Sequence, residues 1–346
     1  MKQTFSLMLA CAFATCAFAQ NQKDRYKDIT NPDLTSINTI EPRASFMSYD
    51  NFTDAADDNK REGTFYLSLN GVWKFNYTDN FNERPIGFEK EDYDTSGWKD
   101  INVPGNWERQ GFGVPIYVNT TYEFTSPAKT EPFWEKPNPP YVPEEWNPTG
   151  TYRRTFELPD DWTGNSIFLS ADGVKGAAFF YLNGQFVGMS KDAKTPARFE
   201  VTDKVKAGKN VIAVQVHRFS DANYLECQDF WRLSGFERDV YLYAQPKTHI
   251  KDFNIKSTLD KSYKDGIFSI AMEIEDESGN FNGSMFFHLL DPNEKSVYSG
   301  DVKIKSDDNT FTIPDIVVKD VDKWSAETPL SLQSSVRTEG RKRQSI

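Results

Sequence analysis

The sequence predicts an all-β chain built from two successive sandwiches, and three observations support this prediction. Long helical periodicity is almost absent, while short runs of alternating apolar and polar residues recur between turn residues. The 346 residues are enough for two domains. After His249 the runs are spaced like the strands of an immunoglobulin-like sandwich. We therefore expect one antiparallel sandwich over residues 45–246 and a second over 247–330.

The N-terminus is typical of a secretory signal. Lys2 precedes an apolar run, and Ala17-Phe18-Ala19 forms a small-x-small cleavage site. A buried N-terminal helix is the alternative, but a polar segment follows at once. We expect residues 1–19 to be removed and the protein to be exported, either to the periplasm or out of the cell. Residues 20–44 then form an extended leader.

Composition excludes several classes of partner. After loss of Lys2, 39 Lys and Arg face 51 Asp and Glu, so the net charge changes from −11 to −12. Nucleic acids and anionic membranes both require a basic face, so neither is an expected partner.

Cys11 and Cys16 leave with the signal, so Cys227 remains alone and the mature chain has no internal disulfide.

The first sandwich shows its strands clearly. Residues 150–159, 177–190 and 210–219 alternate, and Asn183-Gly184 divides the second run with the pair of residues that a type I′ hairpin requires. In 210–219 both faces are apolar, which predicts a central strand. The proline-rich segment 127–148 cannot supply ladder donors and is expected to be a long surface loop.

The polar residues that follow the central strand raise the question of chemistry. Asp221, Glu226 and Asp229 lie within nine residues, but no feature of the sequence singles out one of them as a general acid with a raised pKa. No catalytic pair is therefore predicted in this chain. His217, His249 and His288 are isolated in sequence, so no metal-ligand spacing is present.

Carbohydrate recognition is the other interpretation of this region. Sugars are bound by amides and carboxylates that contact vicinal hydroxyls and by aromatic rings that stack on C–H faces. The candidates of these types are Asn119, Asp221, Asn223, Tyr224, Gln228, Asp229 and Trp231. From residue types alone, a polar loop with satisfied hydrogen bonds explains them equally well.

Several motifs resemble the β-galactosidases of glycoside hydrolase family 2. They include "LNGVWKF" at 69–75, "INVPGNWERQGFGVPIYVNTTYEF" at 101–124, "ADGVKGAAFFYLNGQFVG" at 171–188 and "FSDANYLECQDFWRLSGFERDVYLYAQP" at 219–246. The resemblance implies a jelly-roll sugar-binding domain, an immunoglobulin-like domain and then a TIM barrel that carries the acid/base and nucleophile Glu residues. This chain stops before such a barrel.

The resemblance also assigns roles to single residues. It implies that Asp221 contacts galactose and helps hold a sodium ion, and that Asn119 contacts sugar hydroxyls. The magnesium of the full-length family has its ligands outside this chain. We expect Asp221 and Asn119 to lie near each other at one end of the jelly roll, both open to solvent because the barrel is missing.

The family pattern ends before the chain does. Residues 331–346 match nothing in the family and are expected to be an aberrant, disordered tail after an incomplete second sandwich.

The expected function is that of the N-terminal portion of a β-galactosidase, inactive alone. Its expected partners are a galactoside, the missing barrel portion and, at full length, further copies of itself. The alternative is a free-standing secreted carbohydrate-binding module.

Overall fold

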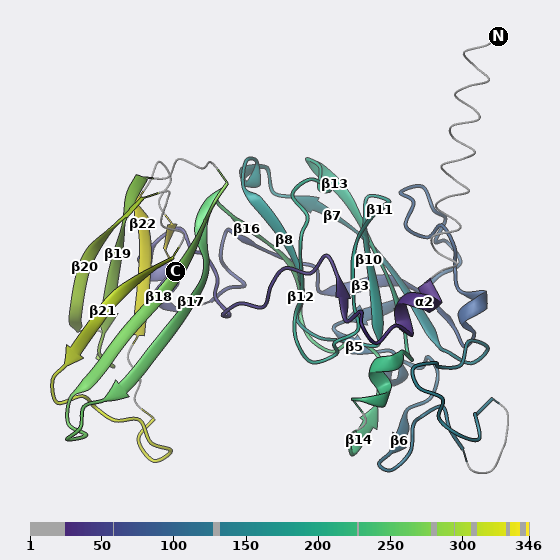
Figure 1. The fold of residues 1–346 in the computed structure, drawn as a ribbon. Coiled ribbons are helices and arrows are strands. Elements are labelled where there is room, and N and C mark those ends of the chain that lie inside the picture. Colours follow the sequence, from purple (N-terminus) through teal and green to yellow (C-terminus); the bar gives the residue numbers. More distant parts are fainter. Residues whose placement is uncertain are drawn as a thin grey trace, which may run out of the picture. The chain divides into compact units, whose positions relative to one another are not determined.

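The computed structural model describes residues 25–345, apart from 58, 127–131, 227, 278–281, 294, 306–309, 330–332 and 340–343. The predicted signal at 1–19 and Cys227 lie outside the described residues. Strands make up most of the ordered structure (Figure 1), which confirms the all-β prediction. The chain divides into two compact units. The first comprises the described residues up to Ile40, Ser68–Asp161 and Phe168–Leu242, and the second comprises Glu41–Leu67, Trp162–Ile167 and the residues from Tyr243 onward.

The first unit is organised around a seven-stranded antiparallel sheet with the order β1-β11-β10-β13-β7-β3-β4. Its strands are β1 (Ser36–Ile37), β3 (Gly71–Thr78), β4 (Lys99–Val103), β7 (Thr149–Leu158), β10 (Ala177–Leu182), β11 (Gln185–Ser190) and β13 (Gly208–His217). A four-stranded sheet has the order β12-β8-β16-β2, from β12 (Ala197–Glu200), β8 (Ser166–Ala171), β16 (Val240–Gln245) and β2 (Tyr66–Ser68), of which β2, β8 and β16 each have residues in both units.

Short elements complete the first unit. Strand β6 (Ile116–Val118) pairs with β14 (Phe230–Arg232), and β15 (Gly235–Phe236) lies between β5 (Gly105–Asn106) and β9 (Val174–Lys175). The helical turns are α2 (Arg25–Ile29), η1 (Phe81–Glu83), η2 (Glu108–Gln110) and η4 (Asp221–Tyr224). Figure 1 shows β6 and β14 projecting from one end of this unit. No helix in the described part of the chain is long and apolar enough to span a bilayer.

The central strand and the hairpin form as predicted. β13 lies between β10 and β7, and its residues from Asn210 to His217 are all buried. β10 and β11 form an antiparallel hairpin in which Asn183 and Gly184 have φ values of 50° and 80°. An asparagine and a glycine tolerate this left-handed conformation, so the local sequence determines the turn.

The predicted boundary at residue 45 differs from the structure. Residues 41–67 belong to the second unit, where the Phe46 and Phe253 rings lie 5.2 Å apart and Ala44 N donates to Asp252 Oδ1 at 2.8 Å. Helix α3 (Phe52–Asp57) lies in this unit. The short helix η3 (Asp160–Trp162) has residues in both units. Trp162 Nε1 donates to Thr64 O at 2.8 Å. The assignment rests on contacts between residues about a hundred positions apart or more, which local patterns do not reveal.

The second unit is a sandwich of two antiparallel sheets. One has the order β17-β18-β21 and the other β20-β19-β22-β23. The strands are β17 (Thr248–Leu259), β18 (Gly266–Asp276), β19 (Asn282–Leu290), β20 (Ser296–Lys305), β21 (Thr310–Val318), β22 (Gln333–Glu339) and β23 (Gln344–Ser345). Both sheets contribute to one core, for example through Met272, Met285, Phe287 and Ile313. Among the described residues this gives the three-plus-four arrangement of an immunoglobulin-like domain.

The last residues differ from the predicted disordered tail and incomplete sandwich. β22 pairs with β19 over seven residues, from Ser284↔Glu339 to Leu290↔Gln333, and β23 pairs with β22. Val336 is buried and is part of the core. The main-chain ladder with β19 supplies this strand's backbone partners, and Val336 adds apolar contact with the core.

Candidate functional site

The loop after β13 is rigidly anchored at its start. We call residues 219–232 the rim loop. Phe219 N donates to Asn147 Oδ1 at 2.9 Å, and Asn147 Nδ2 donates to Phe219 O at 3.0 Å. Ser220 then caps η4 in a capping box with Asn223. The polar residues of the rim loop therefore start from a fixed backbone.

Asp221 is a buried ion-pair partner. Its side chain is 9% exposed, and Lys191 Nζ donates to its Oδ1 at 2.7 Å. The same ammonium donates to Asn31 O at 2.9 Å and to Asp28 O at 3.2 Å. The prediction that Asp221 is open to solvent is therefore wrong, because a lysine from the end of β11 covers it. Within the described chain, no hydrogen bond engages its other oxygen, Oδ2.

The side chains of Asn223 and Tyr224 make hydrogen bonds that stabilise the fold. Asn223 is buried, accepts from Ser220 N at 2.8 Å and donates to Glu123 Oε1 at 2.6 Å. Tyr224 donates its hydroxyl to Tyr141 O at 2.6 Å and so fastens the proline-rich loop. Burial raises the pKa of Tyr224 to about 12. These two candidates from the sequence analysis hold the walls of the site together.

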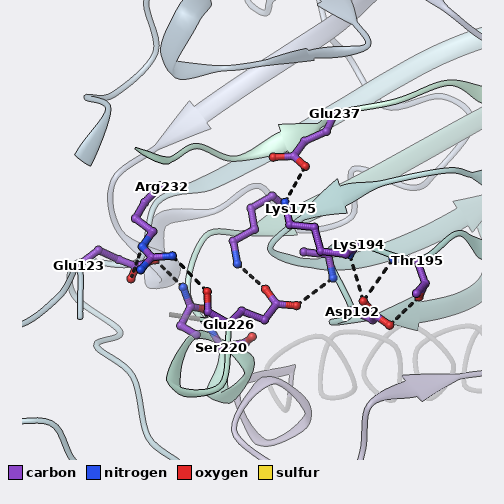
Figure 2. Close-up of polar contacts among 11 residues, drawn as sticks. Glu123, Lys175, Asp192, Lys194, Thr195, Ser220, Glu226, Arg232 and Glu237 are labelled. Carbon is purple, nitrogen blue, oxygen red and sulfur yellow. Dashed lines mark hydrogen bonds and ion pairs between the residues drawn. The ribbon is translucent and has the colours of Figure 1, made fainter. Parts of the chain in front are cut away.

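A buried arginine joins the segments that carry the candidate residues (Figure 2). Arg232, 2% exposed, donates Nη1 to Glu226 O at 3.1 Å and Nη2 to Val118 O at 3.3 Å. Its Nε lies 4.0 Å from Glu123 Oε2. Because Val118 precedes Asn119 in the chain, Arg232 connects the Asn119 segment to the rim loop that contains Asp221.

Glu226 has the surroundings of a structural carboxylate. Its Oε2 forms an ion pair with Lys175 Nζ, and its Oε1 accepts from Ala193 N at 3.1 Å (Figure 2). Both carboxylate oxygens of Glu226 are therefore engaged by groups of the fold.

A second buried ion pair supports the base of the loop. Arg218 donates Nη2 to Arg232 O at 2.9 Å and Nη1 to Val114 O at 3.1 Å, and its Nη1 lies 3.5 Å from Glu108 Oε1. Burial raises the pKa of Glu108, although the Arg218 charge opposes this shift. Arg218 thus binds the carbonyl of Val114 before the strand Ile116–Val118, and Arg232 binds the carbonyl of Val118 at its end.

The solvent-facing part of the site is the ribbon of β6 and β14. Tyr117 and Trp231 are directly paired, are 50% and 56% exposed, and hold their rings 5.7 Å apart in an edge-on arrangement. Tyr117 also donates its hydroxyl to Asp229. Asn119, Gln228 and Asp229 are likewise exposed. Tyr117 was not predicted; its position two residues before Asn119 in "IYVN", on a short strand beside the rim loop, was the available signal.

Comparison with known proteins decides the family. Residues 66–246 match the profile described as "Glycosyl hydrolases family 2, sugar binding domain", and residues 248–341 match "Glycosyl hydrolases family 2". The chain belongs to glycosyl hydrolases family 2. This confirms the resemblance seen in the sequence and extends the family match into the predicted aberrant tail.

Similar proteins in the family are much longer. The β-galactosidase of Priestia megaterium is 36% identical over 304 residues, which are 86% of this chain and 29% of that protein. The β-galactosidase of Streptococcus thermophilus is 35% identical over 302 residues, with 87% and 28% covered. This family 2 chain thus spans less than a third of the length of either relative.

Solved structures show the same fold. A glycosyl hydrolase family 2 member from Bacteroides cellulosilyticus superposes with a TM-score of 0.60 at 18% identity, over 82% of this chain and 36% of that one. Bacteroides uniformis beta-glucuronidase gives a TM-score of 0.61 at 20% identity, over 80% of this chain and 30% of that one. At these identities the likeness concerns the family 2 fold alone.

Proposed function

We propose that this chain is the N-terminal portion of a β-galactosidase and forms one wall of its galactoside site. The observation that carries this proposal is the match to β-galactosidases over only 28–29% of their length. In the family that the sequence resembles, the acid/base and nucleophile residues lie in the barrel that follows this region. Retaining hydrolysis needs two carboxyl groups about 5 Å apart across the bond, and we propose that such a barrel supplies both of them.

The site offers chemistry suited to one side of a sugar. Asp221 contributes a carboxylate whose Oδ1 is held by Lys191, and Asn119 contributes an exposed amide. Carboxylates accept hydrogen bonds from hydroxyls, and an amide both donates and accepts. We propose that a catalytic barrel of the kind the resemblance implies completes this wall, and that the substrate is a terminal β-galactoside.

A hybrid enzyme tests this function. Residues 25–341 would replace the matched N-terminal part of the Priestia megaterium β-galactosidase. We expect the hybrid to hydrolyse a chromogenic β-galactoside, because this chain supplies the same wall to the same barrel, and the 346-residue chain alone to show no turnover.

The exposed ribbon favours one alternative, a free-standing carbohydrate-binding module. Tyr117 and Trp231 offer aromatic surface beside Asp229, which is a composition suited to sugar stacking. Calorimetric titration of the isolated chain with methyl β-galactoside separates the two functions. A dissociation constant below about 1 mM, equivalent to ~4 kcal/mol of binding, would favour the module.

We also propose that the protein is exported, on the basis of the apolar N-terminal run and Ala17-Phe18-Ala19. Expression in a bacterial host followed by intact-mass measurement is expected to find Gln20 as the first residue of the mature protein. A protein that retains Met1 and stays in the cytosol would exclude export.

A further inference from the structure

We infer that the Lys191 ammonium is the resident cation of Asp221 and takes the place that the family resemblance gives to sodium. This inference rests on the proposed function only in treating Asp221 as a residue of the sugar site. The carboxylate that would bind a metal ion is instead held by a side chain of the same unit at 2.7 Å. The residues here therefore do not fit a sodium site of the expected kind.

The geometry satisfies the ammonium completely. A lysine ammonium has three N–H donors and no acceptor. Lys191 Nζ has three oxygen acceptors, namely Asp221 Oδ1 at 2.7 Å, Asn31 O at 2.9 Å and Asp28 O at 3.2 Å. The lysine and the aspartate are 4% and 9% exposed. The site is thus a small oxygen cage that already contains one positive charge.

A sodium ion cannot share this cage. The ion must replace lost water with several oxygen ligands, and the cage oxygens are already used by the ammonium. A second cation at the same carboxylate would also face the buried Lys191 charge at close range, where repulsion is weakly screened. In the described part of the chain, no group of three or more His, Cys, Asp or Glu side chains could hold a metal elsewhere.

The leader has a role in this arrangement. Two of the three oxygens are main-chain carbonyls of residues 28 and 31, at the end of α2 and just after it. α2 itself is fixed by Arg25, whose guanidinium lies 4.4 Å from the centre of the Phe186 ring. Lys191 is therefore a positioning residue that links the leader to Asp221.

Thermal unfolding in different salts tests the assignment on the whole chain. Wild type and Asp221→Asn would be melted in NaCl, KCl and choline chloride at equal ionic strength, about 0.1 M. We expect the wild type to melt at the same temperature in all three salts. A selective rise in NaCl that disappears in Asp221→Asn would overturn the inference, because it would place sodium at Asp221.

Lys191→Met tests the cage itself. The variant leaves a buried carboxylate without its cation, so in choline chloride we expect a melting temperature lower by on the order of 10 °C. NaCl or KCl should restore part of this loss by filling the cage, and the double variant Lys191→Met/Asp221→Asn should show no such recovery. Equal melting of Lys191→Met in all three salts would contradict the cage.

The variant Lys191→Gln, which keeps a hydrogen-bond donor, serves if Lys191→Met does not fold, with the same expected and contradicting results. None of these measurements requires turnover. A hybrid enzyme without galactosidase activity would refute the proposed function and leave the melting results to decide the cation assignment separately.

Discussion

Asp221→Ala in the hybrid enzyme is expected to lower kcat/KM for a chromogenic β-galactoside about 100-fold, or ~2.7 kcal/mol of transition-state stabilisation. The reason is that the variant removes a buried charged group from the sugar wall and leaves the Lys191 ammonium with carbonyl oxygens alone. Loss of one partner from a buried charged contact typically costs 2–5 kcal/mol. The steady-state rate at several substrate concentrations checks this value.

Asp203→Ala is the matched control for that measurement. Its carboxylate is 76% exposed and pairs with the adjacent Lys204, and the expected change in kcat/KM is within about twofold, as for surface substitutions generally. Asn119→Ala, which removes the exposed amide, should fall between the two. Equal activity of the Asp221→Ala and Asp203→Ala hybrids would remove Asp221 from the galactoside site.

Arg232→Ala is expected to destabilise the first unit by about 3–5 kcal/mol, the usual cost of breaking a buried ion pair. The substitution leaves the Glu123 carboxylate, 3% exposed, without its neighbouring cation and releases the carbonyls of Val118 and Glu226. The rim loop and the β6–β14 ribbon should loosen together. Urea unfolding monitored by tryptophan fluorescence measures the loss.

Arg238→Ala provides the comparison for the stability measurement. Arg238 is exposed and donates to two carbonyls at 3.2 and 3.4 Å, so the expected loss is within about 0.5–1 kcal/mol. If Arg232→Ala were no more destabilising than Arg238→Ala, the buried contacts of Arg232, part of which are drawn in Figure 2, would not hold the site together.

The sequence predicted those features that depend on neighbouring residues or on long motifs. The Asn183-Gly184 turn and the central β13 follow from local conformation and burial on both faces. The family was recognised because several motifs occur in order, and the profile matches confirm it. The sugar-binding roles of Asp221 and Asn119 stay predictions.

The features that the sequence did not predict depend on distant partners. Lys191 lies thirty residues before Asp221 and about 160 after the carbonyls that it contacts, and "MSKDAK" contains no sign of this burial. Asn223 and Tyr224 have residue types suited to sugar, yet tertiary contacts with Glu123 and Tyr141 occupy them. A polar side chain in a loop can either bind a ligand or stabilise the fold. Its neighbours in the folded protein determine which of the two it does.

The strand β22 shows a second reason why sequence patterns missed part of the fold. Loss of alternation after residue 330 suggested disorder, but β22 is held by β19 through its backbone. The backbone partners of a strand are on another segment of the chain, so hydropathy along its own sequence does not reveal them.

The proposed role as one wall of a galactoside site is tested most directly by β-galactoside turnover of the purified 346-residue chain and of the hybrid, assayed side by side at equal concentration. We expect no turnover by the chain alone and hydrolysis by the hybrid within about 100-fold of the parent enzyme, since a small misfit between the joined parts can cost that much. Turnover by the chain alone that is lost in Glu226→Gln or Asp229→Asn, or a folded hybrid with none, would contradict it.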